Sequence, residues 1–196
     1  PGLAALLLGI PVSQAAASLD EAHKRHFLWM RRNEIECTFV HDKIRGVLLS
    51  RLTRRQRREL HHRIAHHLQR THPERVFELA YHFDAAEEYA SALPYALAAA
   101  EQARSQHSLE VAEQQYRIAR RGEDSVDRLT RYRIREGLGD VLMLRGRYDE
   151  AQQVFEAAAE VAEGDYARAQ IVGRLGELDF KRGDMKRATQ YVETAL

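Results

Sequence analysis

The sequence predicts an all-α fold in which helical hairpins stack into a superhelix. The pattern that begins at Leu138 recurs at Leu175, so a structural unit repeats after 37 residues. Among the 196 residues, 44% are hydrophobic, 30% are charged and only 4 are proline, which is typical of a helical chain. Repeated units of this length bury their apolar faces only against their neighbours. We therefore expect a surface that binds another polypeptide.

The first fifty residues do not follow the repeat. The apolar run at 3–10 is too short to span a bilayer and lacks a basic segment before it, so we expect no membrane segment. It is interpreted as the end of a buried helix that stops at Gly9 and Pro11. A second helix is expected over 13–27. Its inward-facing residues are expected to be Ala16, Leu19, Ala22 and His23.

Two short strands and a third helix are expected next. The strands cover 28–30 and 37–40, and a polar turn through Arg32, Asn33 and Glu34 joins them. The helix begins at Asp42. Its inward-facing residues are expected to be Ile44, Val47, Leu48 and Leu52. A helix, a β-hairpin and a helix in this order predict the end of a winged-helix domain over 1–52.

Residues 39–45 read F-V-H-D-K-I-R, and V-L-L-S-R-L follows. Together with R-R-E-L-H-H-R-I-A-H-H-L and F-E-L-A-Y-H-F-D-A-A, this segment resembles the winged-helix end of STAND-type signalling ATPases, in which helical repeats follow. The resemblance implies that His41 approaches the β-phosphate of bound ADP and that Asp42 stabilises the next helix. A histidine beside a helix N-terminus suits that role. The residues alone leave another interpretation open, with Asp42 as an N-cap and His41 as a structural residue.

The chain has no G-x-x-x-x-G-K-[ST] loop to hold a nucleotide. We therefore expect no catalysis and no cofactor in this segment. ATP or ADP with Mg²⁺ would belong to an upstream ATPase domain, before Pro1, as a partner of this chain. The missing initiator Met and the apolar stripe of Tyr191, Val192, Ala195 and Leu196 predict that the chain is part of a larger protein.

A divergent linking hairpin is expected over 53–88, with helices near 53–70 and 74–86. Residues 51–75 hold eight Arg against two Glu, so a rival interpretation is a DNA-binding regulator. The candidate nucleic-acid contacts are Arg54, Arg55 and Arg58. The apolar stripe of Leu52, Leu60, Ile64 and Leu68 favours a solvated helix face instead, and aromatic residues for base stacking do not interleave.

Four histidines lie on the first of these helices: His61, His62, His66 and His67. Their i,i+4 spacing can hold a metal ion, but the sequence shows no Cys or carboxylate at matching spacing, so no metal site is expected. The single Cys37 excludes an internal disulfide and favours a reducing, cytoplasmic compartment. We expect this thiol to be buried on its strand.

The repeats are expected over 89–121, 128–163 and 166–196. Five residues recur 37 positions later: Leu138, Gly139, Gly146, Ala151 and Ala158 become Leu175, Gly176, Gly183, Ala188 and Ala195. This pattern resembles the tetratricopeptide repeat, a right-handed superhelix of helical hairpins. The usual period is 34 residues, so an extended loop is expected around 163–166. Arg135 replaces the large aromatic residue expected early in the first helix.

The resemblance implies that the first helix of each hairpin lines a concave groove that binds a protein or peptide. The groove residues are then expected to be Glu101, Arg104, Arg133, Glu136, Asp140, Met143, Glu177 and Lys181. This set lacks the clustered Lys, Asn and Arg that clamp a C-terminal carboxylate in some family members. The alternative is that these are surface residues without a partner. The favoured function is a regulatory arm whose partner binding biases an ATPase switch.

Overall fold

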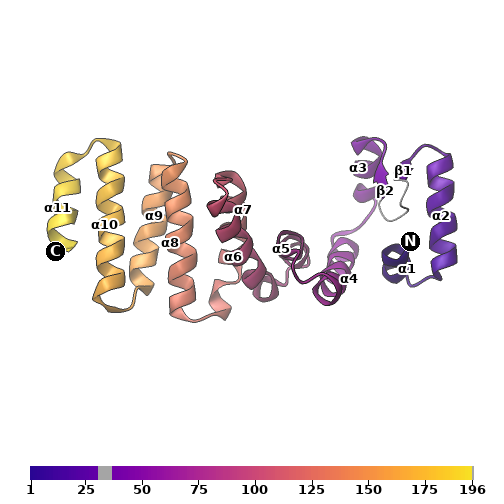
Figure 1. Cartoon of the computed structure of the whole chain (residues 1–196), viewed down its shortest axis with the longest axis horizontal. Coiled ribbons are helices and arrows are strands. Elements are labelled where there is room, and N and C mark those ends of the chain that lie inside the picture. The colour runs from indigo at the N-terminus through magenta and orange to yellow at the C-terminus, as the bar shows by residue number, and fades with distance from the viewer. Residues whose placement is uncertain (31–36, 196) are drawn as a thin grey trace.

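The computed structural model describes residues 1–30 and 37–195, in which the helices follow one another in a row from the N-terminus to the C-terminus (Figure 1). The N-terminal elements are α1 (Gly2–Leu8), α2 (Val12–Lys24), β1 (Leu28–Met30), β2 (Cys37–Phe39) and α3 (Asp42–Ser50). The linking elements are α4 (Arg54–Thr71) and α5 (Val76–Ala85). The repeats comprise α6 (Tyr89–Ser105), α7 (Leu109–Arg121), the short 3-10 turn η1 (Glu123–Ser125), α8 (Arg128–Leu144), α9 (Tyr148–Val161), α10 (Gly164–Arg182) and α11 (Met185–Ala195).

The N-terminal region has the predicted order of elements. The strands β1 and β2 pair antiparallel, with Leu28 opposite Phe39 and Met30 opposite Cys37. The Nδ1 of His23, on α2, lies 2.9 Å from the carbonyl oxygen of Leu28 and ties the helix to the hairpin. The predicted turn through residues 32–34 lies outside the described residues. The element order agrees with the expected helix, hairpin and helix.

Burial in this region differs from the prediction. The helix α1 ends at Gly9, whose φ of 65° is left-handed, but its buried side chain is that of Ala5 alone. Near α3, Val47 is 56% exposed and Leu48 is 47% exposed, so the prediction that these two residues face inward is wrong, whereas Ile44 and Leu52 are half-buried. Cys37 is also exposed, which corrects the expectation of a buried thiol. The described residues supply no layer that covers these apolar side chains.

The linking hairpin forms as predicted. Thr53 begins α4 with a capping box, because its hydroxyl accepts from the Gln56 N–H and the Gln56 side chain accepts from the Thr53 N–H. The helices α4 and α5 then pack onto the first repeat in one apolar cluster. Its buried members include Ala65, Leu68, Leu79, Phe83, Leu93, Ala96, Ile118 and Ile134. The linking hairpin therefore shares its core with α6–α8.

Glycines end the first helix of each of the last two hairpins. Gly146 has φ 73° and Gly183 has φ 86°, a conformation that other residues adopt only with strain. The prediction of an extended loop at 163–166 is wrong, because α9 ends at Val161 and α10 begins at Gly164. The residues beyond the usual period lengthen α10, which has 19 residues.

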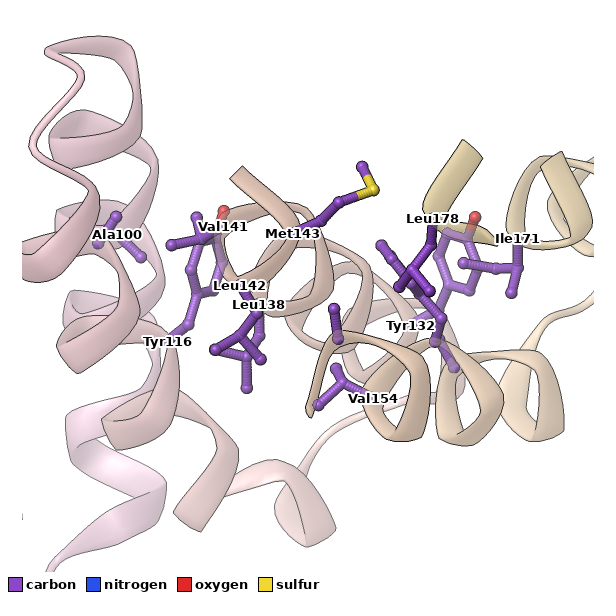
Figure 2. Close-up of a cluster of buried hydrophobic side chains, with 14 of the residues drawn as sticks. Ala100, Tyr116, Tyr132, Leu138, Val141, Leu142, Met143, Val154, Ile171 and Leu178 are labelled. Carbon is purple, nitrogen blue, oxygen red and sulfur yellow. The ribbon is translucent and has the colours of Figure 1, made fainter. Parts of the chain in front are cut away.

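The close approach of paired helices explains the small residues. A Cβ at Gly139 would lie 2.4 Å from the Phe155 ring, and one at Gly137 would lie 2.5 Å from the Tyr116 ring. Both aromatic side chains are almost fully buried. Figure 2 shows part of this core, from Ala100 to Ile171 and Leu178, between successive hairpins. The glycines on α8 thus make room for aromatic rings of the second helices α7 and α9.

Arg135 has a structural role where the repeat pattern expects an aromatic residue. Its guanidinium pairs with Glu123 at 3.0 Å and donates to the Ala157 carbonyl at 2.7 Å. It therefore ties α8 to η1 and to α9, and the missing ring is replaced by hydrogen bonds.

Among the described residues, no single helix is both long and apolar enough to cross a bilayer. The pair α1 and α2 meets the length and composition criteria only together, with a bend of 109° between them.

Candidate functional site

The predicted groove residues are brought together on the first helices of the three repeats. Glu101 on α6 pairs with Arg133 on α8 at 2.7 Å. Asp140 on α8 is contacted at 3.4 Å by Arg104 of α6 and at 3.1 Å by Arg174 of α10. These ion pairs join three consecutive hairpins across one face. We call this set the charge ladder: Glu101, Arg104, Arg133, Asp140, Arg174, Glu177 and Lys181.

The charge ladder continues along α10. Glu177 lies 3.3 Å from Arg174 and 3.5 Å from Lys181. Arg174 was absent from the predicted set, although it lies one turn before Glu177 on the same helix face and could have been included on that spacing. Positive and negative side chains alternate along the face, so a partner would meet charges that already neutralise one another.

Asp140 is the most buried carboxylate of the ladder, with 14% of its side chain exposed. Burial raises its pKa, while the nearby Arg174 and Arg104 oppose that rise. Buried charges need such partners, since an unpaired carboxylate in this position would lose its hydration without compensation. Asp140 therefore fixes the two arginines that flank it.

The structure corrects the groove prediction at Met143. This side chain is only 4% exposed and belongs to the apolar core, so it is not available to a partner. Glu136 lies one turn before Asp140 and is half-buried near Tyr132. Burial and the charge of Glu136 raise the pKa of Tyr132 to about 12. The phenol thus stays protonated on this face at ordinary pH.

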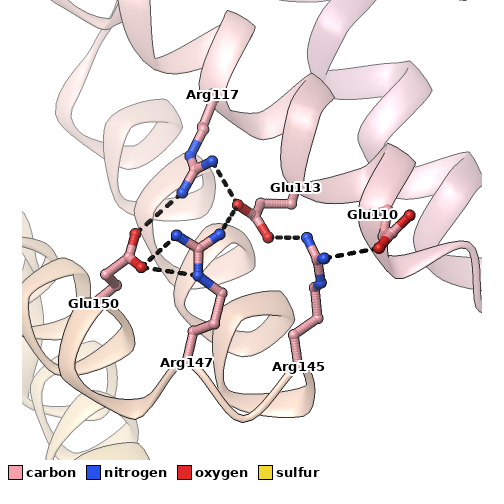
Figure 3. Close-up of polar contacts among 6 residues, drawn as sticks. All are labelled: Glu110, Glu113, Arg117, Arg145, Arg147 and Glu150. Atoms are coloured by element: carbon pink, nitrogen blue, oxygen red, sulfur yellow. Dashed lines mark hydrogen bonds and ion pairs between the residues drawn. The ribbon is translucent and has the colours of Figure 1, made fainter.

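A second charged cluster lies between α7 and the turn that joins α8 to α9 (Figure 3). Glu113 is 2% exposed and contacts Arg117, Arg145 and Arg147. Glu150 pairs with Arg117 at 3.1 Å and also with Arg147. The sequence signal was a glutamate on the buried face of α7, where Ala112 and Tyr116 flank it. Because Arg145 and Arg147, two of the three partners of Glu113, come from the next hairpin, we assign this cluster to stacking of the repeats.

The structure places His41 and Asp42 at the start of α3, and both are exposed. His41 occupies the N-cap position with φ −135°, and its side chain makes no capping hydrogen bond to the described residues of the helix. Asp42 is the first helical residue and lies 3.9 Å from Arg45. The alternative in which Asp42 is the N-cap is therefore wrong. An acidic residue in the first turn still favours the helix through its dipole.

The candidate nucleic-acid contacts lie near the start of α4. Arg54 donates to Glu87 at 2.9 Å through its Nε, and Arg58 donates to the same carboxylate at 2.9 Å. Arg55 is exposed and lines a surface pocket beside them. The single negative charge of Glu87 is shared by Arg54 and Arg58, so both guanidinium groups already have an ion-pair partner, which weakens the case for a phosphate-binding face.

Sequence reasoning missed one constellation on α4. The ligand atoms of His62, His66 and Glu88 all lie within 4.8 Å of one another. The absence of a matching carboxylate was the reason to expect no metal site, and that reason is wrong. Glu88 follows His62 by 26 residues and reaches it only because the α5–α6 turn folds back onto α4.

The comparisons with known proteins concern the C-terminal hairpins. A family model described as tetratricopeptide repeat matches residues 130–196, which hold nearly all of α8 and all of α9–α11. These hairpins are similar to tetratricopeptide repeats. No curated protein and no solved structure matches the chain.

The family match and the helical architecture confirm the all-α, tetratricopeptide-like fold class. Tetratricopeptide repeats suggest protein–protein interaction, because stacked hairpins offer an extended surface to a polypeptide. The resemblance of residues 39–45 to STAND-type ATPases stays a prediction.

Proposed function

We propose that this chain is a non-catalytic protein-interaction segment that binds a protein or peptide partner through the charge ladder. The observation that carries the proposal is the run of ion pairs across α6, α8 and α10, which spans the three repeats on one face. Its acidic and basic groups pair with one another along a surface, whereas catalytic groups converge on a pocket. This arrangement supports recognition of an extended polypeptide.

The alternation of charge supports a partner that carries both signs. An acidic side chain of the partner can form an ion pair with Arg133 or Lys181 in place of the ladder glutamate. A basic side chain of the partner can likewise pair with Glu101 or Glu177. Such exchanges contribute more to specificity and register than to affinity. The free energy lost when a ladder ion pair breaks offsets part of the free energy gained from the new pair. Asp140 is better placed to hold its neighbours than to contact the partner, because it is largely buried.

Photo-crosslinking in the organism that makes the protein tests this surface. A crosslinking residue in place of Arg133 on α8 should capture a discrete partner. The matched control carries the crosslinker in place of Lys186 on α11, a residue that is exposed and outside the ladder. Equal capture from both positions, or none from position 133, would contradict binding through this face.

We further propose that the repeats regulate a STAND-type ATPase in which residues 1–52 end the winged-helix domain. The order of the β-hairpin and the following helix is compatible with that resemblance, and His41 is exposed immediately before the first turn of α3. This placement supports donation from His41 to a phosphate that meets the helix N-terminus. The described residues offer no other phosphate-binding loop, so ATP, ADP and Mg²⁺ would be held by the upstream ATPase domain.

The test of the ATPase proposal uses the longer protein that includes the sequence before Pro1. His41→Ala should speed ADP dissociation, measured by displacement of a fluorescent ADP analogue. His26→Ala is the matched control, since His26 is also exposed but precedes the hairpin. Unchanged dissociation in His41→Ala would rule out the sensor role, and a preceding sequence without a phosphate-binding loop would end the ATPase proposal altogether.

A further inference from the structure

Two histidines of α4 and one glutamate of the α5–α6 turn form a cluster that the proposed interaction function does not use. His62 and His66 are one helical turn apart, so their rings lie on the same helix face. Glu88 is the residue that precedes α6. We call this set the His-Glu cluster: His62, His66 and Glu88.

The backbone around the cluster is fixed on both sides. The capping box of Thr53 sets the start of α4 and hence the direction of its side chains. In the α5–α6 turn, Glu87 adopts φ 62°, and the Glu88 N–H donates to the Phe83 carbonyl at 2.9 Å. A left-handed residue other than glycine costs conformational energy, which the packing of the turn must offset. The turn therefore holds Glu88 against α4.

The distances suit a shared ligand. His66 Nε2 lies 3.3 Å from Glu88 Oε2, and His62 Nδ1 lies 2.5 Å from Glu88 Oε1. Bonds of about 2.0–2.1 Å to a tetrahedral zinc ion place neighbouring ligand atoms roughly 3.3 Å apart. The His66 distance already matches this value, although it is measured to Oε2, whereas His62 contacts Oε1. One ligand atom from each residue lies within 4.8 Å of the other two, so an ion would draw the three atoms closer together. The His62 distance requires a small rotation that opens the present hydrogen bond, and the His62 side chain is 48% exposed and can turn.

The donor set fits a transition metal. Two neutral imidazoles and one carboxylate are ligands that zinc accepts, and the fourth position is then left for water. The cluster borders a surface pocket of about 860 Å³, which has room for that water. The edge of the His66 ring packs against Phe83, with ring centroids 5.3 Å apart, so the ring orientation is supported from behind.

The surrounding charges do not oppose a cation as strongly as the sequence suggests. Arg54 and Arg58 line the same pocket, but both contact Glu87, the residue next to Glu88. His61 faces a different group, since its Nδ1 lies 2.9 Å from the His82 Nδ1. The adjacent histidine pair is therefore separate from the His-Glu cluster.

We propose that His62, His66 and Glu88 bind one divalent transition-metal ion of the zinc class, which joins α4 to the start of the first repeat. The ion replaces the hydrogen bonds between these side chains with bonds to a common centre. Because the ligands come from two segments that meet only in the folded chain, the metal stabilises the folded state that brings them together.

The test titrates the untagged 196-residue chain with Zn²⁺ in competition with a chromophoric chelator. We expect one equivalent to bind and a rise in the midpoint of thermal unfolding. Glu88→Gln keeps the size of the side chain and should weaken Zn²⁺ affinity about tenfold or more, since one of three protein ligands is lost. His66→Gln should give a similar loss.

His67→Gln is the matched control, because it removes a histidine from the same helix but outside the cluster. It should bind Zn²⁺ as the unaltered chain does. Circular dichroism without metal checks that each variant is folded, and the visible spectrum of the Co²⁺-loaded chain should change in Glu88→Gln. Wild-type Zn²⁺ affinity in a folded Glu88→Gln variant would overturn the proposal, as would equal losses in His67→Gln and His66→Gln.

Discussion

The two ends of the described chain use apolar residues in opposite ways. In α8, eight residues are buried, among them Ile134, Leu138 and Val141. In α3, no residue is buried, although Val47, Leu48 and Leu49 are consecutive and apolar. Helix α1 resembles α3, since Leu3, Leu6 and Leu8 are all exposed. Similar hydrophobic content thus leads to a packed core at one end and to an exposed apolar face at the other.

The difference comes from small residues at fixed spacing. The repeats place small residues where neighbouring helices approach closely, as at Gly139 and Ala151, so large side chains such as Phe155 are fully buried. The N-terminal helices have apolar side chains but no such complementary surface among the described residues. Burial in this molecule is therefore decided by the fit between neighbouring hairpins more than by composition.

The largest effect is expected at the contact of Phe155 with Gly139. Phe155→Ala should lower the free energy of unfolding by about 3–5 kcal/mol, because a fully buried ring is replaced by a cavity. Gly139→Ala should lower it by about 1 kcal/mol, since the clash with the ring outweighs the gain in helix propensity. Urea unfolding followed by circular dichroism measures both.

The double variant sharpens this prediction. In Gly139→Ala with Phe155→Ala, the added methyl group enters the space that the ring leaves. The combined loss should then be smaller than the sum of the single losses by about 1 kcal/mol. Simple additivity would contradict the close contact of these two helices.

A smaller effect is expected from the buried carboxylate between α7 and the next hairpin. Glu113→Gln should lower the free energy of unfolding by about 2 kcal/mol, because three arginines lose the negative charge that they share. Glu110→Gln provides the matched control. Glu110 is 85% exposed and pairs only at the edge of the cluster, so its loss should stay below about 0.5 kcal/mol. Chemical unfolding at neutral pH distinguishes the two.

Acidification should weaken the linking hairpin. Burial, followed by the neighbouring His61, lowers the pKa of His82 from 6.5 to about 4. The unfolded chain then binds a proton more readily than the folded one between these values, so stability is full above about pH 6.5 and falls toward pH 4. After solvent screening, this contribution is on the order of 1–2 kcal/mol.

The check compares urea unfolding at pH 7 and pH 5 with a chelator present to remove metal. His82→Gln should show a smaller loss on acidification than the unaltered chain. His72→Gln should keep the original loss, because His72 is exposed. An identical pH dependence in all three proteins would contradict the assignment to His82.

The smallest effect is expected on α3. Val47→Ser should change the free energy of unfolding by less than about 0.5 kcal/mol, since Val47 is 56% exposed. Ile134→Val is the comparison in the repeats and should cost about 0.5–1.5 kcal/mol, because Ile134 is fully buried. A loss at Val47 larger than at Ile134 would break the contrast between the two regions.

The sequence predicted the elements of the fold well, because their signals are local. The repeated pattern that contains Gly146 and Gly183 is read from neighbouring residues, and the structure places both glycines, in the left-handed conformation, where the first helix of a hairpin ends. Burial of Val47 and Cys37 was wrong because helical or strand periodicity shows which face is apolar but not whether anything covers it. The loop expected at 163–166 was wrong because a longer helix can take up the extra residues.

The candidate site was predictable where the repeat fixes it. The ladder residues follow from their place beside the packing positions, and six of the eight predicted residues take part in its ion pairs. Met143 follows Asp140 by three residues, so the two side chains lie on neighbouring parts of α8, and spacing alone does not show which of them faces the core. Glu88 was missed as a partner of His62 because their contact depends on how the α5–α6 turn meets α4, a relation between segments that no local pattern records.

The ion pairs between successive hairpins have a consequence for how such a protein changes over evolution. Arg145 pairs with Glu110 of the preceding hairpin, and Arg182, 37 residues later, likewise pairs with Asp149 of the hairpin before it. Loss or duplication of one whole unit keeps acid opposite base at the new junction. A deletion shorter than one repeat changes the spacing of these acidic and basic residues, so that they no longer lie opposite their ion-pair partners. The spacing of these pairs thus favours growth and shrinkage of the array in complete repeats.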